Sequence, residues 1–221
     1  FSVPSFEKRE EIANRSFPSP KKPIIFIFPI RAIAPTTPMA STIVNKWCKS
    51  NKGTITGAIL AANGIKAYLF EELKPDIAVV VAYGKILPKD VLDYPKYGCI
   101  NVHASILPKY RGAAPIQWAL IDGKEETGVT IMYMAKELDA GDIILQKTTA
   151  IGENEDSLAL TTRLADLGAE ALSEAVVALG NGTAVRVPQE HEKHTYASML
   201  SREMSPIDWN RSAREINCQV R

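Results

Sequence analysis

The sequence predicts an α/β fold, a Rossmann-like, largely parallel sheet with helices on both faces. From residue 73 onward, short apolar runs alternate with segments of helical periodicity. The run at residues 76–81 is rich in β-branched side chains without polar alternation, which is typical of a strand buried on both faces. Such alternation favours parallel strands joined by helices, and ligands of these sheets bind beyond the carboxyl ends of the strands.

The second part of the chain gives the clearest elements. The expected strands are apolar runs bounded by turn residues, at 76–81, 98–102, 128–134 and 143–146. The expected helices start at Pro88, near residue 113 and at the Asp156-Ser157 cap. The last helix carries apolar residues at helical spacing as far as Leu179, and Gly180-Asn181-Gly182 ends it.

Residues 13–70 give a weaker pattern. Seven of the fourteen prolines lie before residue 40, and they interrupt any regular periodicity there. We expect a strand at residues 24–28 and a helix at residues 55–67 in this part.

Composition is that of a soluble globular protein. Hydrophobic residues make up 46% of the 221 positions and charged residues 23%. No apolar run approaches the roughly eighteen residues that a membrane helix needs, so we expect no membrane partner. The three cysteines are scattered without a CxxC pair, which argues against a disulfide framework or a zinc knuckle. This usage fits the reducing cytoplasm, and we expect a cytoplasmic monomer.

Charge is unevenly distributed along the chain. The net charge is +1, but residues 1–70 hold ten Lys and Arg against three Asp and Glu. A basic segment can neutralise the phosphates of a nucleic acid, and it can equally be a solvated surface. Charge alone leaves both interpretations open.

One histidine lies where a loop leaves a buried strand. Asn101 and His103 are two residues apart, so they lie on the same side of that strand near its carboxyl end. An amide can stabilise the oxyanion of a tetrahedral intermediate, and an imidazole can accept the proton that an attacking amine loses. Alternatively, His103 serves only to satisfy a backbone carbonyl. His191 and His194 lie in a polar stretch and are expected at the surface.

A second acidic element follows the third strand. The turn Glu137-Leu138-Asp139-Ala140-Gly141-Asp142 offers a carboxylate that could orient the imidazole and stabilise its charged form, although acidic residues are common in turns. The sequence has no Gly-rich phosphate loop, no HExxH and no Ser or Cys nucleophile beside a base. The pattern therefore favours acid–base chemistry, and neither covalent catalysis nor a metal is expected.

These residues lie in two long motifs that resemble those of the folate-dependent formyltransferases. Residues 100–112 are similar to a signature in which Asn-x-His precedes a Ser-Leu-Leu-Pro-like turn. Residues 128–141 are similar to the second signature, whose catalytic aspartate follows leucine and is Asp139 here. Residues 113–117 resemble the methionyl-tRNA formyltransferase branch in particular. The likeness covers residues 73 to 221.

The resemblance implies catalytic residues Asn101, His103 and Asp139, a 10-formyltetrahydrofolate donor and methionyl-tRNA as acceptor. His103 would take the proton of the amine, Asn101 would stabilise the oxyanion and Asp139 would orient the imidazole. The implied folate contacts come from three segments: Gly84, Ile86, Leu87, Ser105, Ile106, Leu107, Pro108 and Met134. Residues 1–195 would form the catalytic domain, and residues 196–221 a linker with the truncated start of a C-terminal barrel.

The chain departs from the family pattern in three places. The family's first strand is expected to be absent, because the chain begins at the phenylalanine of the turn that follows that strand. Residues 13–70 do not match and contain no basic loop of the kind that enters the tRNA acceptor arm. Ala135 stands where an aspartate is usual. A formyltransferase acting on an amino-sugar nucleotide or glycinamide ribonucleotide, and an inactive folate- or RNA-binding remnant, remain as alternatives.

Overall fold

The computed structural model describes residues 24–27, 37–50, 74–83 and 87–221. A five-stranded sheet with strand order β1-β2-β3-β5-β6 forms its centre. Strands β1 (Ile24–Ile27), β2 (Ile77–Val81) and β3 (Cys99–His103) run parallel to one another. Strand β5 (Glu126–Tyr133) pairs antiparallel with β3, and β6 (Ile143–Ala150) pairs antiparallel with β5. The predicted α/β class is confirmed, and the antiparallel pairing of β5 with β6 follows from the turn that joins these two strands directly.

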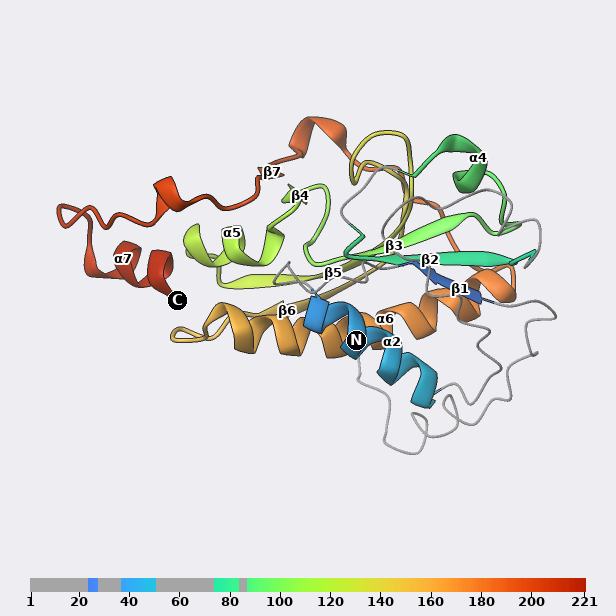
Figure 1. The fold of residues 1–221 in the computed structure, drawn as a ribbon, viewed down its shortest axis with the longest axis horizontal. Helices are drawn as coiled ribbons and strands as arrows, with labels where there is room; N and C mark the ends of the chain where they lie inside the picture. Colours follow the sequence, from blue (N-terminus) through green and yellow to red (C-terminus); the bar gives the residue numbers. More distant parts are fainter. Residues whose placement is uncertain (1–23, 28–36, 51–73, 84–86) are drawn as a thin grey trace.

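Helices cover both faces of the sheet (Figure 1). Helices α2 (Thr37–Ser50) and α6 (Ser157–Gly180) lie on one face, and the short α4 (Lys89–Leu92) lies on the other. Every residue of β2 is buried, because Val79 and Val81 enter the larger apolar cluster while Ala78 and Val80 enter the smaller one beside α4. This two-sided burial explains why the sequence of β2 lacks polar alternation.

The long helix α6 begins and ends as its sequence predicts. The Asp156 side chain caps it by accepting a 2.8 Å hydrogen bond from the backbone N–H of Ala159. Gly182 then adopts a φ of 70°, the left-handed conformation that glycine takes without a steric penalty. The apolar stripe of α6 packs against β5 and α2.

Helix α2 was not expected, because prolines crowd its surroundings in the sequence. Pro38 lies in the first turn, where a missing backbone N–H needs no partner. Met39 and Ile43, four residues apart, are both buried against α6. The sequence therefore contained apolar residues at helical spacing, but too few of them to predict a helix.

A second, two-stranded sheet lies beside the main one. Strand β4 (Arg111–Gly112) pairs in parallel with β7 (Tyr196–Ala197), so the first residues of the expected linker are joined to the loop that follows β3. Helix α5 (Pro115–Ile121) follows β4, and α7 (Ala213–Val220) packs against it. Two short 3-10 turns, His191–Lys193 and Arg202–Met204, flank β7.

Several expectations fall outside the described residues. They include the helix at residues 55–67, the folate contacts Gly84 and Ile86, and most of the basic residues of the first third. Among the helices of the described ranges, none combines the length and apolar character needed to cross a membrane.

Candidate functional site

Strand β3 carries both polar residues of the expected site near its carboxyl end. Its alternating side chains place Ile100 and Val102 in the larger apolar cluster, so Asn101 and His103 lie on the opposite face of the sheet. β3 lies between β2 and β5, with Asn101 paired to Val80 and Met132 on either side. The central position of the strand fixes the backbone of both residues.

The imidazole of His103 lies between a carbonyl and a carboxylate. Its side chain is buried, with 6% exposed, and Nε2 lies 2.8 Å from the carbonyl oxygen of Tyr110. A carbonyl can only accept a hydrogen bond, so Nε2 carries a proton. Nδ1 faces Oδ2 of Asp139 at 3.7 Å, and it is the nitrogen that can receive a second proton. Asp139 stabilises the positive charge that this proton would bring.

Asp139 is held in an unusual backbone conformation. Its φ is +48°, a left-handed value that residues other than glycine adopt rarely and at a free-energy cost. Its Oδ2 accepts a 2.9 Å hydrogen bond from the backbone N–H of Gly112. A Cβ atom at Gly112 would lie 2.6 Å from the carbonyl oxygen of Ala197, so only glycine fits where the loop passes β7. The expected pairing of this turn with His103 is therefore seen in the structure.

The amide of Asn101 has a different environment. The residue is half-buried and makes no side-chain hydrogen bond to another described residue. Among the described residues, none competes with a ligand for its donor and acceptor groups on the face that carries His103.

The loop after His103 is held by hydrogen bonds to its backbone from side chains of β5, of β6 and of the loop itself. Thr130, on β5, donates to the carbonyl of Ser105 at 2.6 Å and accepts from the backbone N–H of Leu107 at 3.2 Å. Gln146, on β6, donates to the carbonyl of Leu107 and to Thr130 Oγ1, both at 2.9 Å. The hydroxyl of Ser105 donates to the carbonyl of Lys109 at 2.6 Å. Ser105 and Leu107, two of the expected folate contacts, are buried in this arrangement.

The other described folate contacts differ in exposure. Ile106 and Pro108 are half-buried in the same loop. Leu87 is buried in the smaller apolar cluster, and Met134 packs against that cluster from the end of β5. The cluster lies on the face that carries Asn101, so Leu87 and Met134 lie on the same face of the sheet as the polar groups.

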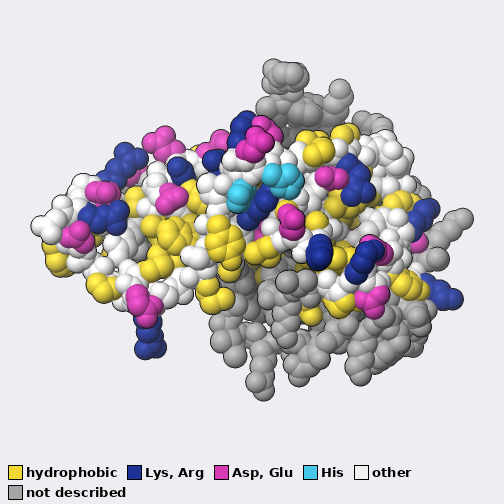
Figure 2. Space-filling model, turned by 90° about the horizontal axis from the view of Figure 1, so that it is seen from above, with side chains coloured by type: hydrophobic (Ala, Val, Ile, Leu, Met, Phe, Trp, Pro, Cys, Tyr) yellow, Lys and Arg dark blue, Asp and Glu magenta, His cyan; other side chains and the backbone are white. Residues whose placement is uncertain are grey.

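Sequence reasoning missed two residues next to the site. Arg111 and Gln189 are buried, and the amide oxygen of Gln189 accepts from the Arg111 guanidinium at 2.7 and 3.1 Å. The Arg111 guanidinium also lies 3.1 Å from Nδ1 of His191. Both His191 and His194 are exposed, as expected from the sequence. Figure 2 shows histidine side chains between basic and acidic ones on the face of the molecule above the sheet.

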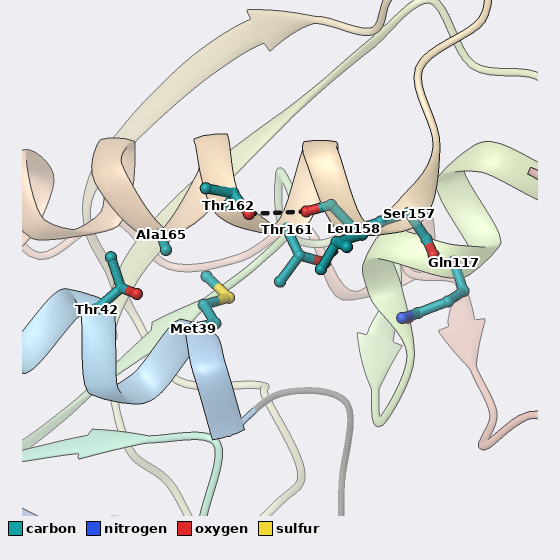
Figure 3. Close-up of a pocket in the computed structure, with 8 residues that line it drawn as sticks. All are labelled: Met39, Thr42, Gln117, Ser157, Leu158, Thr161, Thr162 and Ala165. Carbon is teal, nitrogen blue, oxygen red and sulfur yellow. Dashed lines mark hydrogen bonds between the residues drawn. The ribbon is translucent and has the colours of Figure 1, made fainter.

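A cavity of about 120 Å³ lies on the other side of the sheet (Figure 3). Met39 points from α2 toward α6, and Gln117 closes one end from α5. The cavity opens on the face occupied by the larger apolar cluster, away from His103. Its lining is mostly hydroxyl and apolar side chains: Met39, Thr42, Gln117, Ser157, Leu158, Thr161, Thr162 and Ala165.

Comparison with known proteins identifies the family. The sequence model of the family described as "Formyl transferase" matches residues 38–176. The chain belongs to the formyl transferase family. The match begins at residue 38, inside the stretch 13–70 that we expected not to match, and it includes the unexpected helix α2.

Curated relatives with high identity share one name. The methionyl-tRNA formyltransferase of Caldanaerobacter subterraneus subsp. tengcongensis is 52% identical over 151 residues, which are 68% of this chain and 49% of that protein. The protein of the same name from Geotalea daltonii is 53% identical over 150 residues, covering 68% of this chain and 48% of that protein. The chain spans about half the length of the curated relatives it matches.

Several solved structures share the fold, among them that of a formyltransferase. HypX from Aquifex aeolicus in complex with tetrahydrofolic acid superposes with a TM-score of 0.74 at 17% identity, covering 90% of this chain and 34% of that one. The formyltransferase PseJ from Anoxybacillus kamchatkensis superposes with a TM-score of 0.64 at 24% identity, covering 82% of this chain and 88% of that one. At these identities the likeness concerns the fold.

Proposed function

We propose that the chain carries the catalytic part of an enzyme that transfers a formyl group from 10-formyltetrahydrofolate to the α-amino group of methionyl-tRNA. The observation that carries the proposal is the pair of buried His103 and half-buried Asp139, next to Asn101, which projects from the same face of a central strand as His103 and has no side-chain hydrogen bond to another described residue. The identity of about 50% to proteins named methionyl-tRNA formyltransferase supports this acceptor. The folate complexes of two structural neighbours support this class of donor.

The proposed reaction begins with attack of the neutral amine on the formyl carbon. A carbon–nitrogen bond forms, and the amine proton passes to Nδ1 of His103, directly or through one water molecule. The carboxylate of Asp139 stabilises the resulting imidazolium, because it lies 3.7 Å from Nδ1. When the intermediate collapses, the bond to the folate nitrogen breaks, and the imidazolium returns the proton to that nitrogen.

Asn101 stabilises the intermediate in this proposal. The formyl oxygen becomes an oxyanion, and a neutral amide N–H aimed at it lowers the free energy of the transition state. The side chain of Asn101 has no other partner among the described residues, so no hydrogen bond to any of these residues must break first. Holding the donor and the acceptor in contact contributes as well, since it removes the entropy cost of bringing them together.

The described residues fit the flat faces of the rings of a folate. Leu87 is buried in the apolar cluster on the face that carries Asn101, Met134 packs against that cluster, and Ile106 and Pro108 are half-buried in the loop after His103. A mostly apolar wall with a few polar groups is the usual environment of such ligands. Ser105 and Leu107 act through the loop, because their polar groups are already hydrogen-bonded.

The acceptor is tested by competition between substrates. The 221-residue chain is incubated with 10-formyltetrahydrofolate and either methionyl-tRNA, free methionine, an amino-sugar nucleotide or glycinamide ribonucleotide. Formylation of methionyl-tRNA in preference to the other three acceptors is expected, and His103→Ala should abolish most of it. Product on the amino sugar alone, or equal product with the variant, would refute the proposed activity.

The proposal places the protein in the cytoplasm, as a monomer, with initiator tRNA as partner. If the basic residues of the first third contact the acceptor arm, tRNA affinity should fall with salt, with a logarithmic slope of about −0.9 for each phosphate neutralised. We expect weak binding with little preference for the initiator in this chain. Titration of labelled tRNA at three salt concentrations measures the slope, and tight, salt-independent binding would contradict it.

A further inference from the structure

We propose that Gln189 is a positioning residue that holds Asp139 against His103. The inference rests on the proposed function, because it assigns the support of the same pair. Gln189 lies fifty residues after Asp139 in the chain, yet only 4% of it is exposed. Its amide nitrogen donates to the carbonyl oxygen of Asp139 at 2.9 Å and to that of Gly141 at 2.7 Å.

The orientation of this amide is dictated by its partners. The two carbonyl oxygens of the turn can only accept hydrogen bonds, and the guanidinium of Arg111 can only donate them. The nitrogen of Gln189 must therefore face the turn, and its oxygen must face Arg111. All the polar groups of the Gln189 side chain are in use, so a rotated amide would lose four hydrogen bonds.

The turn needs such support. Asp139 has a φ of +48°, and this conformation is disfavoured unless surrounding contacts fix it. Gln189 bonds to the carbonyl of Asp139 itself and to that of Gly141, so it spans the residues around the strained position. The backbone N–H of Gly112 fixes the Asp139 carboxylate from the other side.

Arg111 makes the support continuous with the loop of His103. It precedes Gly112, whose N–H binds Asp139, and it follows Tyr110, whose carbonyl binds His103. Its guanidinium is buried and is paired with no carboxylate among the described residues, so it relies on neutral acceptors, Gln189 above all. Gln189 thus links the peptide that carries the partner of His103 to the turn that carries Asp139.

Two variants separate this role from plain stability. Gln189→Leu removes every hydrogen bond of the side chain, whereas Gln189→Glu keeps the contact with Arg111 and replaces the donation to the turn by a carboxylate oxygen that repels the two carbonyl oxygens. We expect both variants to lower kcat about tenfold or more, as misplacement of a catalytic group does, with KM for the folate unchanged. In an Asp139→Asn background, the same substitutions should have little further effect, because a positioning residue acts through the group it positions.

Gln219 provides the matched control. Its amide nitrogen also donates to two backbone carbonyls, those of Met204 and Pro206 at 2.9 and 3.1 Å, but at α7 and away from the site. Gln219→Leu should lower stability by losing the same chemistry and leave kcat unchanged.

A spectroscopic readout keeps the inference independent of turnover. The chain has three histidines, so the ¹⁵N resonance of His103 Nδ1 can be assigned by its loss in His103→Ala. We expect Gln189→Glu to shift that resonance in the same direction as Asp139→Asn, while Gln219→Leu leaves it in place. If the wild type transfers no formyl group, the proposed function fails and this shift alone decides the role of Gln189.

Three results would overturn the inference. They are a folded Gln189→Glu with wild-type kcat, an unmoved His103 resonance, and an equal loss of kcat with and without Asp139. If Gln189→Leu does not fold, the isosteric Gln189→Glu carries the test by itself.

Discussion

The loop that presents His103 and the turn that presents Asp139 are supported in opposite ways. In the loop after His103, Ser105 and Leu107 are bound by Thr130 on β5 and Gln146 on β6, the two strands that follow β3 in the order of the sheet. The turn after β5 contains exposed Glu137 and Leu138 and depends on Gly112 and Gln189, at sequence separations of 27 and 50 residues.

The difference shows how the two halves of a site can depend on different parts of a chain. The position of His103 depends mainly on the sheet, because its strand lies in the sheet and the side chains that bind Ser105 and Leu107 project from β5 and β6. The position of Asp139 depends on the segment after α6. This segment brings Gln189 into hydrogen-bonding contact with the turn and pairs β7 with β4. When the segment around residues 186–197 is disturbed, the turn that carries Asp139 should therefore be displaced before the strand that carries His103.

The largest expected effect comes from the pair itself. His103→Ala and Asp139→Asn should each lower kcat by about a hundredfold or more, the scale of general-base and electrostatic contributions. If the two groups work as one unit, the double variant should be hardly slower than the slower single variant. Steady-state formyl transfer by the wild type, the two single variants and the double variant measures this double-mutant cycle. Multiplicative losses would mean that the two halves of the site act separately.

A smaller effect is expected at the support of the loop. Thr130→Val keeps the shape of a fully buried side chain but leaves the N–H of Leu107 and the amide of Gln146 short of an acceptor. Such unpaired groups destabilise a protein by about 1–3 kcal/mol each, and urea unfolding would measure the loss.

Thr161→Val is the control for this substitution. The Thr161 hydroxyl donates only to the Ser157 carbonyl within α6, a bond that adds little to helix stability. An equal loss of stability in both variants would show that the loop gains nothing special from Thr130.

The His103 half of the site could be predicted from sequence far better than the Asp139 half. The strand ending in Asn101-x-His103 has a local pattern, and β-strand alternation alone places both side chains on one face. That alternation cannot say which carboxylate of residues 137–142 faces the imidazole, and only the family resemblance selected Asp139. The structure brings that residue to His103.

Gln189 and Arg111 carried no sequence signal of their own. Gln189 begins a polar stretch that looks like a solvated surface, and its burial depends on a contact across fifty residues. The same limit applies to α2, whose buried Met39 and Ile43 acquire meaning only when α6 packs against them. The antiparallel pairing of β5 was likewise hidden, because a buried strand reads alike in either direction.

Tyr110 offers a smaller test of the loop through pH. Its hydroxyl donates to Asp122 Oδ2 at 2.7 Å, and burial together with this hydrogen bond raises the pKa of Tyr110 above its ordinary value. A raised tyrosine pKa means that the folded state holds the proton longer than the unfolded state. This contribution to stability is complete below about pH 10 and is lost as the pH rises through the folded-state value.

Tyr110→Phe should therefore cost about 1 kcal/mol at neutral pH, the usual net value of one hydrogen bond. The difference from wild type should shrink above pH 10, and urea unfolding at pH 8 and pH 10.5 would measure it. Tyr196→Phe, at an exposed tyrosine, is the control. A difference that grows with pH would contradict the assigned direction.

The smallest effect is expected at the most exposed apolar side chain of the turn. Leu138 lies beside Asp139 with 56% of its surface exposed, so Leu138→Ser should change the free energy of unfolding by less than about 0.5 kcal/mol. The turn is held through backbone carbonyls by Gln189 and through the Asp139 carboxylate by Gly112, and none of these contacts involves the Leu138 side chain. The kcat and the His103 resonance should also stay at wild-type values. A clear fall in kcat with unchanged stability would mean that Leu138 contacts a substrate, and the turn would then bind as well as orient.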